Sequence, residues 1–365
     1  MSDPTLPAGR RARLDALLER RSLAAVWVAR PATFAWLTGG DNVVDRTADV
    51  GVAAAGYDGE ELRVVTNDVE AGRLADEQLP AGVAVDAYEW HASSLASAVA
   101  DRSPRPAAAD FAVPGLAALE ADEFRGPLTD DDVDRYRRLG ATVAEAVEGV
   151  CRAAASDDAE RAVAADLRGR LTRAGVETPV VLVGGADRAT AYRHYTPTAA
   201  DLGDYALVSV TAERDGLFAS CSRTVAFDPP AWLSARHRAA CRVEATALAA
   251  TRAVGREGGT AGDVFEAVRK AYDAVGWSGE WRDHHQGGAA GFAGREWIAT
   301  PGATASVRLP MAYAWNPTVA GAKSEGTVLV TASGYERLTA GGWPTLAVEA
   351  VGRDERLERP GLLRR

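Results

Sequence analysis

Apolar and polar residues along the first third of the chain alternate between the spacing of helices and that of buried strands. Residues 10–21 predict a helix, and the short apolar run 24–28 predicts a buried strand. Further strands are predicted at 50–55, 61–66, 83–87 and 107–111, with a turn at Asp58-Gly59 and a helix over 91–101. Helices that alternate with strands in this way predict an α/β domain with a mixed sheet.

The pattern changes near Gly126-Pro127, which we take as the boundary between domains 1–127 and 128–365. Thr129 then predicts a helix N-cap, and three aspartates follow in the first turn, where the helix dipole favours negative charge. Apolar residues recur at helical spacing as far as Val150. A long amphipathic helix is therefore expected at the start of the second domain.

The rest of the chain contains two successive groups of elements, each a helix pair followed by strands. Residues 156–174 predict the second helix of the first group, with Ser156 and Asp157 as its caps. The remaining predictions are a strand-rich block at 180–227, a helix pair at 232–255 and 260–275, and strands over 307–332. Two such halves in succession predict a duplicated α+β domain.

Composition narrows the classes of partner and compartment. The 365 residues are 47% hydrophobic and 25% charged, as in globular proteins, and the net charge of -10 argues against nucleic acid or an anionic membrane surface as main partner. No apolar run reaches the roughly 18 residues of a membrane span, and the N-terminal stretch lacks the apolar core and cleavage site of a signal peptide. We therefore expect a cytoplasmic protein. The 3 cysteines are odd in number and widely spaced, which predicts neither a disulfide framework nor a zinc knuckle.

Short strings along the chain carry a family resemblance. They are Phe34-Ala35-Trp36-Leu37-Thr38-Gly39, Arg193-His194-Tyr195 followed by Leu202-Gly203-Asp204, and Lys323-Ser324-Glu325 followed by residues 327–330. In this order they resemble a strand end, the run before the ligand strands and the closing "Arg-x-Glu" block of the prolidase, aminopeptidase P and creatinase family. The resemblance implies a creatinase-type α/β N-terminal domain, an α+β C-terminal domain with the pita-bread fold, and a homodimer.

The same resemblance assigns five metal-ligand positions, and four of them hold other residues. Members of the family bind two divalent ions with two aspartates, a histidine and two glutamates, and the ions generate a hydroxide nucleophile. The aspartates fall on Ser209 and Ser220, the histidine on Gly288 and the first glutamate on Asn316, so that only Glu325 is kept. One carboxylate cannot balance four positive charges. We therefore expect no metal and no other cofactor.

Polar groups on the substrate side of the expected cleft are retained. His194 stands where creatinase, a metal-free relative, has its acid–base histidine, and an ordinary imidazole pKa of about 6.5 suits that role. His284 stands where aminopeptidase P-like members carry a substrate-side histidine, and Arg295 replaces another, adding a charge that can clamp a carboxylate. Glu325 and Asn316 are expected to point into the same cleft. The structural alternatives are a hydrogen-bonded strand-end histidine, a solvated histidine loop and an ion pair of Arg295 with Glu296 or another neighbour.

Covalent chemistry and nucleotide binding receive less support from the sequence. Ser220 or Cys221 could form a nucleophilic pair with His194, but successive strand residues point to opposite faces, so only Ser220 is expected to face the cleft. No nucleophile elbow is visible. Gly287-Gly288 and Gly291 lack nucleotide-binding spacing and predict a backbone turn.

The residues leave three functions open, and whether the chain is an enzyme is open with them. The first is a metal-independent hydrolase of a C–N bond in a small polar substrate, with His194 as acid–base and Glu325 as orienting anion. Its binding groups would be Ser209, Ser220, His284, Arg295 and Asn316. The second is a non-catalytic pseudoenzyme that binds a peptide or protein, and the third is a metal-dependent Xaa-Pro peptidase whose ligands are misassigned. The retained polar groups favour the first function over the second.

Overall fold

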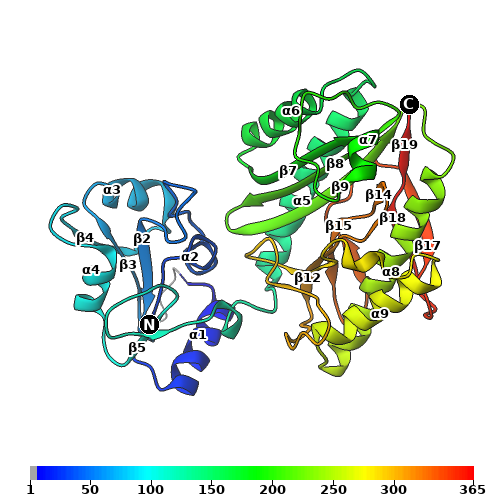
Figure 1. The fold of residues 1–365 in the computed structure, drawn as a ribbon. Helices are drawn as coiled ribbons and strands as arrows, with labels where there is room; N and C mark the ends of the chain where they lie inside the picture. The colour runs from blue at the N-terminus through cyan, green and yellow to red at the C-terminus, as the bar shows by residue number, and fades with distance from the viewer. Residues whose placement is uncertain (1–5) are drawn as a thin grey trace. The chain divides into compact units, whose positions relative to one another are not determined.

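The computed structural model describes residues 6–365, so the first five residues of the N-terminal stretch considered above lie outside it. The chain divides into two units, residues 1–126 and residues 127–365, which Figure 1 colours from blue to cyan and from teal to red. No helix of the described chain is both long and apolar enough to cross a membrane.

A six-stranded sheet in the order β4-β3-β2-β1-β5-β6 forms the centre of the first unit. Strand β1 pairs antiparallel with β2 and parallel with β5, so the predicted mixed sheet is confirmed. The strands are β1 Ala25–Val28, β2 Ala53–Tyr57, β3 Leu62–Asn67, β4 Ala84–Tyr88, β5 Ala107–Ala109 and β6 Ala117–Ala118. The helices are α1 Ala8–Arg21, α2 Pro31–Thr38, α3 Ala71–Arg73 and α4 Leu95–Arg102, with short turns η1 Leu74–Gln78 and η2 Ala121–Glu123.

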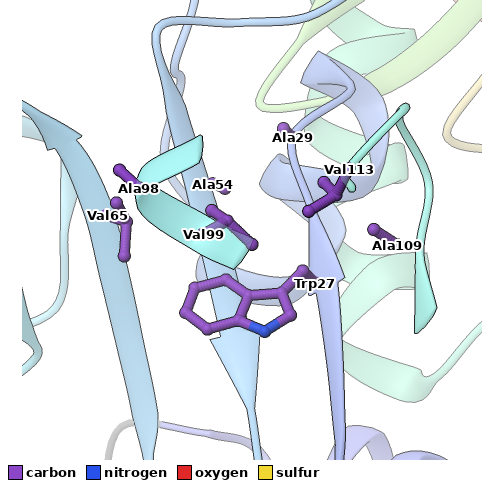
Figure 2. Close-up of a cluster of buried hydrophobic side chains, with 8 residues drawn as sticks. All are labelled: Trp27, Ala29, Ala54, Val65, Ala98, Val99, Ala109 and Val113. Carbon is purple, nitrogen blue, oxygen red and sulfur yellow. The ribbon is translucent and has the colours of Figure 1, made fainter. Parts of the chain in front are cut away.

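The core of this unit gathers around the indole of Trp27 (Figure 2). Alanine and valine side chains from β2, β3, β5 and α4 surround it: Ala54, Val65, Ala98, Val99 and Ala109. The indole Nε1 donates to Ser103 Oγ at 2.9 Å. Gly56 lies opposite Trp27 in the register of β2, and a Cβ there would come within 2.6 Å of the ring. The small residues of this sheet therefore make room for one large aromatic side chain.

The strand end predicted for Phe34–Gly39 is wrong, because this segment belongs to helix α2. Pro31 stands at the first helical position, where its fixed φ favours a helix start. Gly39 ends the helix with a φ of 83°, a left-handed conformation that glycine adopts without strain. These local start and stop signals outweigh the likeness of the string to a strand end.

The second unit is built from two halves that share one nine-stranded sheet in the order β11-β10-β12-β15-β9-β8-β7, with β16 beside β15 and β19 beside β9. Helix α5 packs on β8 and β9, and α8 packs on β12 and β15 (Figure 1).

The helices are α5 Asp130–Ala153, α6 Glu160–Arg173, α7 Ala186–Ala191, α8 Leu233–Glu257 and α9 Ala261–Ala274, with the turn η3 Glu280–Arg282. The sheet strands are β7 Glu177–Gly185, β8 Tyr205–Arg214, β9 Leu217–Ala226, β10 Gly287–Ala290, β11 Trp297–Ile298, β12 Met311–Trp315, β15 Gly326–Val330, β16 Tyr335–Arg337 and β19 Leu362–Arg364. Two further hairpins pair β13 Thr318–Val319 with β14 Ala322–Lys323 and β17 Thr345–Glu349 with β18 Arg356–Pro360. The predicted duplicated α+β arrangement is confirmed.

Two local predictions for this unit are wrong. Ser156 and Asp157 do not cap α6, whose N-cap is Ala159, because residues 155–158 form a separate turn closed by the Asp158 N–H on the Ala155 carbonyl at 3.1 Å. Gly287-Gly288 is not a turn but the start of strand β10, which pairs with β12. The second error matters for the site described below.

The two half-sheets meet between β9 and β15, where a buried carboxylate secures the junction. Glu244 of α8 is fully buried and accepts hydrogen bonds from Arg359 Nε at 2.8 Å and from the Gly326 N–H at 3.2 Å. The Ser324 hydroxyl and a second Arg359 nitrogen also donate to it. Ser324 and Gly326 stand at the start of β15 and Arg359 lies in β18, so Glu244 links α8 to both strands.

Glu244→Gln is expected to lower the free energy of unfolding by about 3–5 kcal/mol, because it leaves the buried Arg359 guanidinium without a counter-charge. The measurement is urea unfolding of the full chain followed by tryptophan fluorescence. The control is Glu266→Gln, which removes an exposed partner of Arg269 on α9. Equal midpoints for the two variants would contradict the role given to Glu244.

Candidate functional site

A cavity of about 530 Å³ lies in the second unit, at the junction of the two half-sheets. Its polar lining includes His194, Ser209, His285, Arg295, Asn316, Lys323 and Glu325, and its apolar lining includes Pro179, Val180, Leu182, Phe218 and Ile298. Val180 and Ile298, on strands at the two ends of the sheet order, are each 41% exposed. The cavity therefore has both polar and apolar lining, and strands from the two ends of the sheet order contribute to it.

Glu325 sits between two cationic side chains. Its Oε1 accepts from Arg295 Nη2 at 3.0 Å, and its Oε2 accepts from Lys323 Nζ at 2.9 Å and Ser222 Oγ at 2.6 Å. Burial raises the pKa of the carboxyl, but Lys323 and Arg295 outweigh it and bring the pKa to about 2. Glu325 is therefore an anion whose two oxygens are both engaged by groups of this chain.

The guanidinium of Arg295 joins two of the positions that the family resemblance assigns to metal ligands. While Nη2 contacts Glu325, Nη1 donates to Ser220 Oγ at 3.0 Å and to the Gly294 carbonyl at 2.6 Å. The ion pair considered from the sequence therefore exists with Glu325 as partner. Contrary to the expectation that Ser220 faces the cleft, Ser220 is 1% exposed and is not among the residues that line the cavity.

Ser209 of β8 and Cys221 of β9 have different surroundings. Ser209 lines the cavity, and its hydroxyl lies 2.7 Å from Ser222 Oγ and 3.4 Å from Tyr195 Oη. Cys221 is fully buried, and burial raises the pKa of its thiol to about 11. Cys221, like Ser220, is not among the residues that line the cavity.

Gly288, the position that the family resemblance assigns to the ligand histidine, has no room for a side chain. Gly288 lies in β10 and pairs with Ala314 of β12. A Cβ placed on Gly288 would lie 2.1 Å from the Trp297 carbonyl oxygen and 2.8 Å from the Trp297 ring. The indole and backbone of β11 thus occupy the space into which a side chain at this position would extend.

Asn316 carries an unsatisfied polar atom at the cavity. Its backbone N–H donates to the Gln286 carbonyl at 3.0 Å, and its side chain is 4% exposed. The Oδ1 atom is buried without a hydrogen-bond partner. Since buried acceptors are nearly always paired, this oxygen is suited to receive a donor from a bound molecule.

Three histidines converge on the cavity. His194 Nε2 lies 3.1 Å from His284 Nε2, and the rings of His284 and His285 stack with centroids 4.4 Å apart. Burial, and then the charge of Lys323, lowers the pKa of His284 to about 2, while burial and the charge of Arg295 lower that of His285 to about 4. The pKa of His194 is also lowered, chiefly by burial, so the expectation of an ordinary value is wrong. All three imidazoles are neutral near pH 7.

Sequence reasoning missed the roles of Lys323 and Ser222 as partners of Glu325. A signal for Lys323 was present, because it is one of only two lysines in the chain and stands two residues before Glu325. Residues two apart on an extended segment project to the same face. The cross-strand contact of Ser222 had no comparable signal.

Comparison with known proteins places this arrangement in a family. The model of metallopeptidase family M24 matches residues 134–332, which is more than half of the chain. In sequence, no curated protein matches.

Solved structures match over nearly the whole chain. Dipeptidase PepE from Mycobacterium ulcerans is 21% identical, with a TM-score of 0.72 over 93% of this chain and 98% of that one. X-Pro aminopeptidase from Thermotoga maritima is 14% identical, with a TM-score of 0.71 over 91% and 97%. Prolidase from Pyrococcus horikoshii is 15% identical, with a TM-score of 0.69 over 91% and 98%. These likenesses and the matched family model lead to one conclusion: the chain belongs to metallopeptidase family M24.

Proposed function

We propose that this chain is a metal-independent hydrolase that cleaves a C–N bond in a small substrate held in the cavity of the second unit. The observation that carries the proposal is the pairing of Glu325 with the Arg295 guanidinium and the Lys323 ammonium. Two cations of the protein itself neutralise the carboxylate that a family metal site would use. Side chains of the protein must then activate the water and protonate the leaving nitrogen.

The donor set does not fit the dinuclear centre of the family. Ser209 and Ser220 offer neutral hydroxyls already bonded to Ser222 and Arg295, and Gly288 offers no donor and no space for one. Hard divalent ions bind through several anionic oxygens, and Glu325 alone supplies them here. Among the described residues, the one group of three or more His, Cys, Asp or Glu close enough to share an ion is the histidine cluster, which contains none of the five positions. These facts speak against a metallopeptidase with misassigned ligands.

His194 is the acid–base group of the proposed reaction. Hydrolysis adds water across the C–N bond: the carbon gains the hydroxyl, and the leaving nitrogen gains the proton. A neutral imidazole at the cavity can take the proton from water and pass it to the nitrogen. His284 orients His194 through the 3.1 Å contact between their Nε2 atoms. Asn316 Oδ1 accepts an N–H of the substrate, which gives the unsatisfied oxygen a partner.

The lining of the cavity favours a substrate with two unlike ends. Its scissile polar group would lie against His194 and Asn316, while a flanking apolar group would contact Val180, Leu182 or Ile298. The similar structures are described as a prolidase, a dipeptidase and an X-Pro aminopeptidase, which act on small peptides, and a short peptide or acyl amide meets both requirements. A cytoplasmic location and a homodimer remain predictions of this proposal.

Non-catalytic binding is the second candidate, and one observation favours it. The single carboxylate of the cavity has both oxygens engaged, so it is not free to activate water. A protein of the same fold is described as the N-terminal domain of a FACT complex subunit from chickpea, with a TM-score of 0.61 at 11% identity. The retained histidine pair is the reason that we place hydrolysis first.

Turnover is expected to persist in the presence of a chelator, because no step uses an ion. The experiment follows amine release from Xaa-Pro dipeptides, guanidino acids and small acyl amides after dialysis against EDTA. Activity that disappears and returns with Mn²⁺ or Co²⁺ would support the metallopeptidase instead. Ligands that raise the melting temperature without being cleaved would support the binding function.

His194→Ala is expected to lower kcat by at least about 100-fold, the lower end of what acid–base groups contribute, with little change in KM. Steady-state kinetics and a melting curve of the variant provide the measurement. His91→Ala is the control, since His91 is exposed and lies in the first unit. A variant with full kcat would remove His194 from the mechanism.

Gly288→Ala is expected to destabilise the second unit by about 1–3 kcal/mol through overpacking against Trp297. Gly334→Ala is the matched control, because no atom lies within 4 Å of a Cβ at that position. Urea unfolding compares the two variants. If Gly288→Ala were as stable as Gly334→Ala, the space for a ligand histidine would not be closed.

A further inference from the structure

We propose that His194, His284 and His285 form a binding site for one divalent transition-metal ion of the zinc type, separate from the five ligand positions of the family. One ring nitrogen of each histidine lies within 4.8 Å of those of the other two. His194 and His285 line the cavity, so an ion can enter from it, while the buried His284 closes the inner side.

The spacing of the nitrogens is close to that of a three-histidine site. Zinc binds imidazole nitrogen at about 2.0–2.1 Å, so tetrahedral ligand nitrogens lie about 3.4 Å apart. His194 Nε2 and His284 Nε2 are 3.1 Å apart and need to separate by only a few tenths of an ångström. Since all separations are within 4.8 Å, the third ring closes by at most about 1.4 Å. His285 is exposed and can make this adjustment by rotating its side chain.

The charges around the cluster restrict which ions it can take. Lys323 and Arg295 face the histidines and repel a cation, and Glu325 offsets only one of these two charges. Magnesium, calcium and manganese prefer oxygen ligands and would gain too little from three imidazoles. Zinc, copper, nickel and cobalt bind imidazole strongly and are the ions that can overcome the repulsion. The fourth ligand is a water molecule from the cavity.

An ion in this site would compete with the proposed chemistry. Its bond to His194 uses the lone pair with which that imidazole would accept a proton. Bound zinc is therefore inhibitory to a hydrolase that depends on His194. The site itself rests on the three side chains and not on the proposed function, because binding can be measured without a substrate.

The test is titration of the untagged, chelator-treated full chain with Zn²⁺ by calorimetry and with Co²⁺ by visible absorption. One equivalent of Zn²⁺ is expected, with a Co²⁺ spectrum of tetrahedral type and no comparable binding of Mn²⁺. His194→Ala and His285→Ala alter exposed side chains and should each weaken Zn²⁺ binding by at least about 100-fold, the upper end of what outer-shell changes cost. Melting curves show whether each variant is folded.

Two controls separate this site from others. His91→Ala tests the remote exposed histidine, and Ser220→Ala tests a family ligand position; both are expected to keep wild-type Zn²⁺ affinity. No binding at millimolar Zn²⁺, a stoichiometry of two, or loss of affinity in Ser220→Ala but not in His285→Ala would overturn the proposal. Failure of turnover with every substrate would leave the binding result intact, so the two proposals can fail independently.

Discussion

The buried carboxylate of Glu325 is the constraint on which the site depends. An ionised group that is only 4% exposed needs compensating charge and hydrogen bonds. Lys323 supplies a positive charge from β14, and Arg295 supplies a second positive charge from the segment between β10 and β11. Ser222 of β9 donates a hydrogen bond. These three contacts tie the two half-sheets and that segment together. The need to compensate the charge of Glu325 therefore determines both which segments form the wall of the cavity and which charges lie at its centre.

Much of the fold could be predicted from the sequence, because its signals are local. The helical spacing after Thr129, the break at Gly126-Pro127 and the repeated helix pairs each lie within one stretch of chain. The string Phe34–Gly39 failed for the same reason: its likeness to a strand end ignored Pro31 and Gly39, which start and stop a helix.

The site could be predicted only as far as positions along the chain determine it. Counting along the ligand strands predicted substitutions at Ser209 and Ser220. The alternation of strand residues predicted that Ser220 faces the cavity and Cys221 does not, but neither residue is among those that line it. The contact between Arg295 and Glu325 joins residues 30 apart, and the filling of the space at Gly288 by Trp297 depends on strand pairing. Neither can be read from spacing, since both arise when separate strands pack.

The charge of the site explains why these substitutions can occur together. In the family pattern, two divalent ions face four carboxylates and the arginine of the closing block. On the proposed assignment of the five positions, this chain lacks three of the carboxylates, and a metal-free site would also lack the two ions. Lys323 then stands for that arginine, and Arg295 is an added cation. Removing four positive and three negative charges leaves a deficit of one positive charge, which the guanidinium of Arg295 restores. Under this proposal the centre of the site keeps the same net charge. Burial is the main cause that lowers the pKa of His284 and His285, and the charges of Lys323 and Arg295 add to it. A site changed by unselected decay would have no reason to keep that balance, and we therefore propose that the substitutions are one replacement of metal cations by a protein cation.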